Sequence, residues 1–298
     1  MKEIEESILI QKEENANEGE NFKYIIEGIL DVKNNLLFNS KEEIKIEELE
    51  VFINNKKVKI KKEGKKYNFD SNIFKKKYKF KISFKNLIKN IYFEDCINLN
   101  IIDFTNFDIP NITDMSWMFT KCHELKKIKG INKFNTSKVT NMNEMFQECN
   151  KLINLDLNFD TSNITDMGRM FNKCHELKEI KGINKFNTNK VTNMRAMFQE
   201  CNNLINLYLN FDTSNVNDMG WMFNKCHELK EIKGINKFNT NKVTNMKAMF
   251  QNCYKLINLD LNFDTSNVID MGWMFTKCHE LKEIKGINKF NTNKVTKW

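Results

Sequence analysis

Cysteine and histidine are the residues of this 298-residue chain whose types and spacing could do chemistry. The eight cysteines recur at intervals of 26, 27, 25, 27, 25, 27 and 25 residues, and each of the four histidines directly follows a cysteine. Paired thiols could form disulfides, and thiols beside imidazoles could hold zinc. The residues are Cys96, Cys122, Cys149, Cys174, Cys201, Cys226, Cys253 and Cys278, with His123, His175, His227 and His279.

These cysteines mark an internal repeat over residues 93–298. A 25-residue coil alternates with a 27-residue coil, so that the larger unit has 52 residues, and the line CHELKEIKGINKFNT recurs almost unchanged. Self-similarity at such a period is typical of solenoids, in which each coil buries its apolar edge against the next.

Two apolar patterns follow one another within each coil. An alternating stretch after each cysteine, such as Leu152 to Phe159, predicts a short strand, and Gly130 and its equivalents predict the turn that follows. A stripe of apolar side chains spaced by three or four residues predicts a helix of about three turns, formed in one coil by Val139, Met142, Met145, Phe146 and Cys149.

We therefore predict an α/β fold: a right-handed leucine-rich-repeat solenoid over residues 93–298, with one parallel strand and one short helix in each coil. The last coil is incomplete in this sequence, and no C-terminal cap is visible. We expect its end to expose Ile284, Ile287 and Phe290 unless Trp298 folds over them, which predicts end-to-end self-association or a truncated member of a family.

A small antiparallel β domain is predicted for residues 21–92, after a disordered acidic tail at residues 1–20. Asn54-Asn55 between two strand-like runs indicates a hairpin. Tyr78, Phe80, Ile82 and Phe84 alternate with lysines, so this strand has one apolar and one basic face. Because the domain runs into residue 93 without a flexible linker, we expect it to cap the first coil.

The repeated lines FDTSNITDMGRMF (159–171), followed by CHEL, and QECNNLINLYLNFDTSN (199–215) resemble the BspA-like leucine-rich repeats of bacterial and protist surface proteins. The resemblance covers residues 93–298. It implies a non-catalytic protein that attaches to host or extracellular-matrix proteins, and it implies a cell-surface location. No signal peptide and no stretch of 18 apolar residues is visible, which favours the cytoplasm instead.

The geometry of a solenoid indicates whether the cysteines and histidines can bind zinc, form disulfides or only pack in the core. Adjacent coils lie about 4.8 Å apart, so histidines in every second coil lie roughly 10 Å apart. Two ligands of one zinc lie within about 4 Å of each other, so successive histidines cannot share a metal ion. We predict a column of buried, reduced thiols, which suits the cytosol, while a disulfide ladder between adjacent coils stays open. No metal and no cofactor is expected.

Two outward columns are candidate binding surfaces. The strand face carries a mixed, roughly neutral lattice that suits a protein partner better than a phosphate backbone; its candidates are Asp156, Asp260, Lys129, Lys181, Lys233 and Tyr208. The helix column carries large side chains typical of binding hot spots, namely Trp117, Arg169, Trp221 and Trp273. Each has a structural alternative: a solvated sheet face for the first, and a cover over the seam between coils for the second.

The resulting hypothesis is a non-catalytic scaffold for protein–protein interaction or adhesion. Catalysis requires unlike groups that converge in one pocket, whereas every Cys and His here is copied in register, so we expect neither an enzyme nor a small-molecule substrate. An alternative is a binder of RNA or anionic lipid through residues 51–92, which carry 14 Lys against 2 acids, although nucleic acid is the less expected partner. A self-associating structural array is a third possibility.

Overall fold

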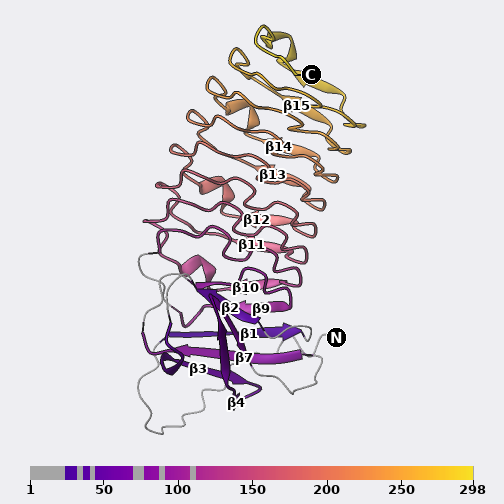
Figure 1. Cartoon of the computed structure of the whole chain (residues 1–298). Coiled ribbons are helices and arrows are strands. Elements are labelled where there is room, and N and C mark those ends of the chain that lie inside the picture. The colour runs from indigo at the N-terminus through magenta and orange to yellow at the C-terminus, as the bar shows by residue number, and fades with distance from the viewer. Residues whose placement is uncertain are drawn as a thin grey trace.

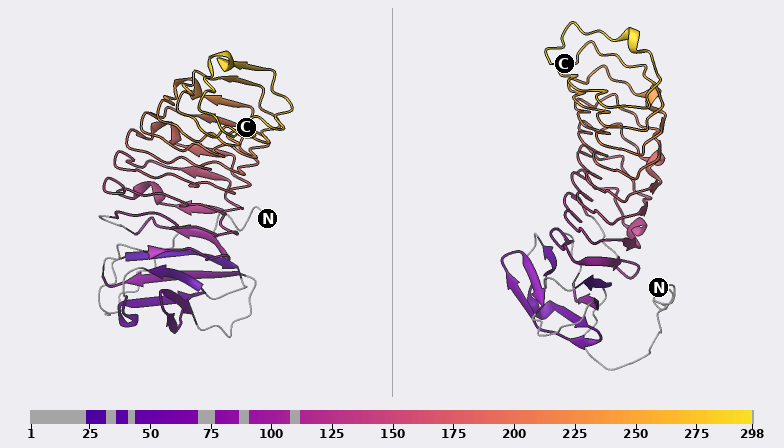
Figure 2. Two further views of the ribbon diagram at one scale, coloured as in Figure 1. Left: turned by 45° about the horizontal axis from the view of Figure 1, so that its top comes forward. Right: turned by 90° about the vertical axis from the view of Figure 1, so that its right-hand side faces the viewer.

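The computed structural model describes residues 24–31, 36–40, 44–69, 77–86, 91–107 and 112–297. A β domain forms one end, and a stack of coils rises from it (Figure 1). The stack bends gently along its length, and its successive strands lie side by side (Figure 2). The predicted tail at residues 1–20 and the residue Trp298 lie outside the described residues.

The β domain is built from two sheets that face each other. The first has the order β10-β9-β1-β7-β3-β4 and the second β5-β6-β2-β8. Their strands, with one 3-10 turn, are β1 (Tyr24–Asp31), β2 (Leu36–Ser40), η1 (Ile46–Glu48), β3 (Leu49–Ile53), β4 (Lys56–Lys57), β5 (Ile60–Glu63), β6 (Lys66–Phe69), β7 (Lys77–Phe84), β8 (Ile91–Tyr92), β9 (Leu99–Asp103) and β10 (Lys127–Lys129).

Aromatic side chains fill the space between these sheets. Phe38 of β2 stacks on Tyr67 of β6, with ring centroids 4.6 Å apart, and meets Phe84 of β7 edge-on at 5.8 Å. The predicted alternation in β7 is confirmed, because its four aromatic and aliphatic positions are buried. The predicted hairpin is also confirmed: Asn54 and Asn55 both have positive φ, as a two-residue turn between β3 and β4 requires.

The first sheet joins the β domain to the solenoid. Strand β1 pairs with β7 on one side and antiparallel with β9, the strand of the first coil, on the other; β9 then pairs in parallel with β10. Gly28 lies at the crossing, where a Cβ atom would collide with the carbonyl oxygen of Ile101 and the ring of Phe80. A residue without a side chain is therefore needed for β1 to cover the edge of the first coil.

Each coil contributes one short parallel strand, as predicted. The later strands pair in twos, β11 with β12, β13 with β14 and β15 with β16, each short coil with the long coil that follows. The strands are β11 (Asn154–Asp156), β12 (Glu179–Lys181), β13 (Asn206–Tyr208), β14 (Glu231–Lys233), β15 (Asn258–Asp260) and β16 (Glu283–Lys285). The predicted fold class, a repeat solenoid preceded by a small β domain, is confirmed.

Glycine makes the turn after each long-coil strand. Gly182 has φ 85°, and a Cβ there would collide with the carbonyl oxygen of Leu157 in the preceding coil. Short 3-10 helices follow this glycine and its equivalents, namely η2 (Ile131–Lys133), η3 (Ile183–Lys185), η4 (Ile235–Lys237) and η5 (Ile287–Lys289). The backbone conformation and the close approach of the coils both exclude a side chain at these positions.

The prediction of a helix in each coil was wrong. Between Met142 and Cys149 the chain makes successive tight turns, closed by bonds such as Cys149 N–H to Phe146 C=O at 3.1 Å, with positive φ at Glu144 and Glu148. Alternate amides donate instead to the next coil, for example Phe146 N–H to Met170 C=O at 2.9 Å. Apolar side chains spaced by three residues occur in a series of tight turns as well as in a helix. The hydrogen bonds between adjacent coils favour the turns here.

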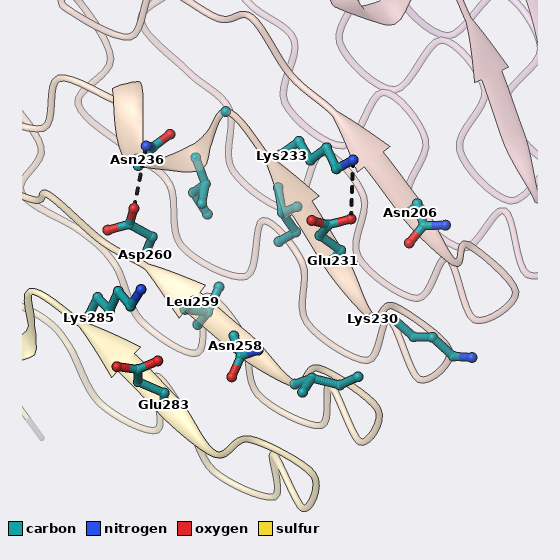
Figure 3. A pocket seen from close by; sticks show the side chains of 14 residues that line it. Asn206, Lys230, Glu231, Lys233, Asn236, Asn258, Leu259, Asp260, Glu283 and Lys285 are labelled. Atoms are coloured by element: carbon teal, nitrogen blue, oxygen red, sulfur yellow. Dashed lines mark hydrogen bonds and ion pairs between the residues drawn. The ribbon is translucent and has the colours of Figure 1, made fainter.

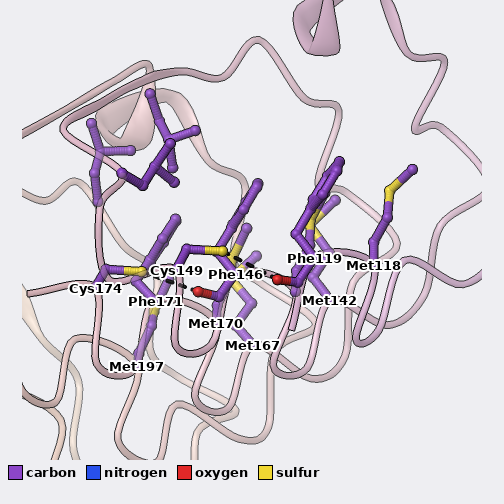
Figure 4. Close-up of a cluster of buried hydrophobic side chains, with 14 of the residues drawn as sticks. Met118, Phe119, Met142, Phe146, Cys149, Met167, Met170, Phe171, Cys174 and Met197 are labelled. Carbon is purple, nitrogen blue, oxygen red and sulfur yellow. Dashed lines mark hydrogen bonds between the residues drawn. The ribbon is translucent and has the colours of Figure 1, made fainter. Parts of the chain in front are cut away.

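The core is a set of columns that run along the stack (Figure 4). Phe119, Phe146 and Phe171 stack with centroids 5.6 and 5.7 Å apart and nearly parallel planes. The Cys149 thiol donates to the Phe119 carbonyl oxygen one coil earlier, at 3.2 Å. Cys174 repeats this contact with Phe146 at 3.1 Å, so each of these thiols has a hydrogen-bond acceptor inside the core.

A polar ladder runs beside these columns. Asp166, Asn193 and Asp218 occupy equivalent places in successive coils and form single bridges between them. The Asn193 side-chain amide donates to the Asp166 carboxylate at 3.0 Å, and the Asn193 Oδ1 accepts from the Arg195 amide at 3.0 Å. Alternation of Asp in short coils with Asn in long coils therefore keeps like charges from facing each other in adjacent coils.

The last coil is less buried than those before it. Ile287 is 42% exposed, and Ile284 and Phe290 are half-buried. A hollow of about 380 Å³ opens beside them, lined in part by Trp273 and Phe275. End-to-end self-association through this end stays a prediction.

Candidate functional site

The outward face of the repeat strands is built by period-two alternation. In β11, β13, β14 and β15 the middle residue is buried and the first and third are exposed. The first positions carry Asn in short coils and Glu in long coils; the third carry Asp or Tyr in short coils and Lys in long coils. We call Glu179, Glu231 and Glu283 the glutamate row, and Lys181, Lys233 and Lys285 the lysine row.

A groove of about 520 Å³ lies on this face where β14 and β15 belong to different two-stranded sheets. Side chains from four neighbouring strands converge on it (Figure 3). The polar contacts drawn there are weak: Lys233 approaches Glu231 of its own strand at 3.7 Å, and Asn236 donates to Asp260 at 3.5 Å. Asn206 and Asn258 carry amides with no partner among the described residues, so the groove offers unused donors and acceptors.

Tyr208 interrupts the carboxylate column of the short coils. It is 60% exposed at the end of β13, where β11 has Asp156 and β15 has Asp260. Its neighbours in the adjacent coils are Lys181 and Lys233. Two lysines therefore flank the Tyr208 ring, and no acidic side chain lies between them. Tyr208 was predicted as a candidate because it differs from the residues at the equivalent positions of the other short coils.

The remaining strand-face candidate, Lys129, lies apart from this groove. It occupies β10, where it pairs with Asp103 of β9 at 3.6 Å. Of the strand-face candidates, Lys233 and Asp260 therefore line the groove, Tyr208 is the strand partner of Lys233, Lys181 lies on β12 outside the groove, and Lys129 is in an ion pair near the β domain.

The tryptophan column contacts cations of neighbouring coils. The Arg195 guanidinium lies 4.2 Å from the Trp221 ring centroid, and the Lys247 ammonium lies 5.4 Å from Trp221 and 4.7 Å from Trp273. These are cation–π distances, so the rings and cations form a ladder along the stack. Sequence reasoning identified the two tryptophans and missed both cations.

Small residues make room for that ladder. Ala196 and Ala248 stand at the equivalent positions between tryptophans and are buried. Trp117, in the second coil, is 40% exposed, and Arg169 pairs with Glu144 at 3.1 Å. Trp221 is therefore engaged within the fold, whereas Trp273 stays 55% exposed. In the sequence, the pairs Arg195-Ala196 and Lys247-Ala248 alternate with Gly-Trp, and this alternation of cations with tryptophans could have predicted the ladder.

The histidines belong to ion pairs and ring stacks. His123 and Lys173 approach the Glu148 carboxylate at 3.4 and 2.9 Å. Burial raises the pKa of Glu148, but the hydrogen bonds and charges of Lys173 and His123 outweigh it and hold the pKa below its usual value. In the C-terminal half His227 stacks on Tyr254, with centroids 4.6 Å apart. Within the described ranges, no group of three metal-ligating side chains of the His, Cys, Asp or Glu type occurs.

The cysteines are free thiols, seven of them buried and Cys278 half-buried. Burial raises the pKa of Cys226 to about 12 and that of Cys278 to about 11, and raises the others above the usual value too. A thiol held in its protonated form is a poor nucleophile and a poor metal ligand. In this arrangement the column packs the core.

The basic residues of the β domain are divided between its two sheets. Lys57 of β4 pairs with Glu50 of β3 at 2.6 Å, whereas Lys61, Lys62 and Lys66 belong to β5 and β6 of the other sheet. Lys77, Lys79 and Lys81 do form a row along one face of β7, but the lysines of β5 and β6 lie on the other sheet and do not continue it.

The repeat region matches the family described as "Mycoplasma protein of unknown function, DUF285" over residues 85–182, 176–283 and 229–298, more than half of the chain. The chain belongs to this family. The resemblance to BspA-like leucine-rich repeats is confirmed at the level of the repeat. A solved structure similar to this DUF285 chain is a leucine rich cell surface protein from Faecalibacterium prausnitzii A2-165, with 14% identity and a TM-score of 0.27, covering 65% of this chain and 74% of that chain.

No curated protein matches the DUF285 chain. Among the residues that the structure describes, no helix has the length and apolar character needed to cross a bilayer.

Proposed function

We propose that this DUF285 protein is a non-catalytic scaffold that binds a partner protein through the outward face of its repeat strands. The observation that carries the proposal is Tyr208, an aromatic ring that is 60% exposed and is the strand partner of Lys233, which lines a groove of about 520 Å³. Exposed aromatic anchors beside polar groups are typical of protein interfaces. The leucine-rich cell surface protein named above is consistent with an adhesion role.

The other columns support this choice by contrast. Arg195 and Lys247 already cover faces of the Trp221 ring, and Glu148 already holds Lys173. A partner that used Trp221 or Glu148 would have to break contacts within the fold, although Trp273 is 55% exposed. Asn206 and Asn258 on the strand face have no such contacts to lose, so they can bond to a partner without that cost.

Site-specific photo-crosslinking tests the proposal. A photoreactive phenylalanine analogue replaces Tyr208, Trp273 or Lys79, which report on the strand face, the tryptophan column and the basic strands. The full chain is then irradiated with lysate and, separately, with an extracellular-matrix extract. We expect protein adducts from position 208 in excess of those from 273 and 79. Equal labelling from all three positions, or nucleic acid and lipid captured only at 79, would overturn the proposal.

A further inference from the structure

The strand face is a periodic lattice, and its period restricts the shape of a partner. The lysine row and the glutamate row repeat every second coil. Hydrogen-bonded strands lie about 4.8 Å apart, and stacked Phe rings of adjacent coils lie 5.6 and 5.7 Å apart. Lys181 and Lys233 are therefore separated by roughly 10 Å along the stack axis, twice the strand spacing. The same interval separates Glu179 from Glu231.

Among regular peptide conformations, a polyproline II helix repeats at nearly this interval. It has three residues per turn and a rise of about 3.1 Å, so each of its faces recurs every ~9.3 Å. In a β-strand, side chains on one face recur every ~6.8 Å, which does not match. Two turns of an α-helix span ~10.8 Å and come close in length.

The side chains that line the groove favour a polyproline II helix over an α-helix as the ligand. An α-helix docks its apolar face into an apolar groove. This groove is lined mainly by Asn, Lys, Glu and Asp; of its four apolar side chains, Ile232, Ile235 and Leu259 are buried, which leaves only Ile257 partly exposed. The carbonyl groups of an α-helix are also bonded internally, whereas those of polyproline II are free. The unpartnered amides of Asn206 and Asn258 face outward beside the rows and can donate to such free carbonyls.

Charge complementarity then specifies the side chains. A segment that lies along the stack turns one face to the lysine row and another to the glutamate row. An acidic residue in every turn can pair with Lys181 and Lys233, and a basic residue in every turn can pair with Glu179 and Glu231. Tyr208 stands in line with the two lysines where the other short coils have Asp156 and Asp260, so at this position no acid of the chain itself competes with the segment for those lysines.

We propose that the strand-face site binds an extended polyproline II segment that carries one acidic residue, one basic residue and one proline in each turn and that lies along the stack axis. This inference rests on the proposed function, because it names the partner chemistry of the same face.

Isothermal titration calorimetry with two synthetic peptides tests the inference on the full chain. The first peptide consists of four Pro-Lys-Glu triplets, and the second has the same composition in an order that places no two acids three residues apart. Their net charges are equal, so a difference in affinity reports the spacing. We expect the shuffled peptide to bind about tenfold more weakly, about 1.4 kcal/mol, as the loss of two or more matched pairs implies.

Two variants locate the site. Tyr208→Asp restores the residue that Asp156 and Asp260 occupy in the neighbouring short coils, so the fold already accommodates it, and binding of the periodic peptide should fall at least fivefold. Tyr254→Asn restores the residue of the other short coils, Asn150 and Asn202, and should leave binding unchanged. Equal binding of the two peptides, absence of binding, or no effect of Tyr208→Asp would overturn the inference.

The crosslinking experiment distinguishes the two failures. Protein adducts at position 208 without a preference for the periodic peptide would contradict the polyproline II partner but not the proposed scaffold function. If neither the adducts nor the preference is observed, both proposals are wrong.

Discussion

Alkaline pH should destabilise this protein through its cysteine column. The folded chain buries seven thiols and holds their protons, with the pKa of Cys226 raised to about 12 and that of half-buried Cys278 to about 11. Thiols of the unfolded chain ionise with a pKa of about 8.5. The stability that the buried thiols contribute is therefore fully present below about pH 8.5 and falls as the pH rises toward the folded-state values.

The size of the effect follows from the number of thiols. At pH ~9.5 an unfolded thiol is about nine-tenths ionised, which favours unfolding by about 1.4 kcal/mol for each buried thiol. A cooperative unit of three coils would lose ~4 kcal/mol, a large part of the 5–15 kcal/mol typical of a whole domain.

Urea unfolding followed by circular dichroism, in the presence of a reductant, measures the loss at about pH 7.5, 8.5 and 9.5. Cys201→Ala provides the matched control: the variant starts less stable because of the lost side chain, but its stability should fall less steeply above pH ~8.5, by about 1.4 kcal/mol per pH unit. Equal stability at the lowest and highest pH, or an unchanged slope in Cys201→Ala, would refute the reasoning.

Two further substitutions test the packing between coils. Asn193→Asp places a third carboxylate between those of Asp166 and Asp218 and removes an amide donor, so we expect a loss of about 3 kcal/mol in the free energy of unfolding that disappears near pH ~3, where carboxylates are protonated. Gly182→Ala combines a strained positive φ with a backbone collision, so we expect a loss above ~2 kcal/mol. Gly64→Ala, at a positive φ in open space, should cost only about 1 kcal/mol.

Urea midpoints of each variant check both expectations. Asn184→Asp, which adds the same charge at an exposed position of η3, should change the midpoint little. A loss in Asn184→Asp as large as that in Asn193→Asp would point to net charge and against the ladder. Equal losses in Gly182→Ala and Gly64→Ala would show that close approach of the coils contributes nothing.

Repetition and local patterning carried the sequence-based predictions that the structure confirms. One strand per coil follows from alternation after each cysteine, and the hairpin at Asn54 and Asn55 follows from residues that tolerate positive φ. Tyr208 was visible because near-identical repeats make any departure stand out. The strand and hairpin signals lie within a few residues and depend on local chemistry, whereas the Tyr208 signal depends on comparison of repeats 52 residues apart.

What the sequence by itself determined, then, is the period, the strands and the side chains that point inward or outward. The tertiary structure alone decided where the remaining backbone amides bond: those of Glu144 and Phe146 reach the next coil, so turns replace the expected helix. It also decided that Arg195 covers Trp221, a contact between residues 26 positions apart, and that side chains from β13 to β16 line one groove. These outcomes depend on neighbouring coils, because the energy of each contact exists only once the coils are stacked.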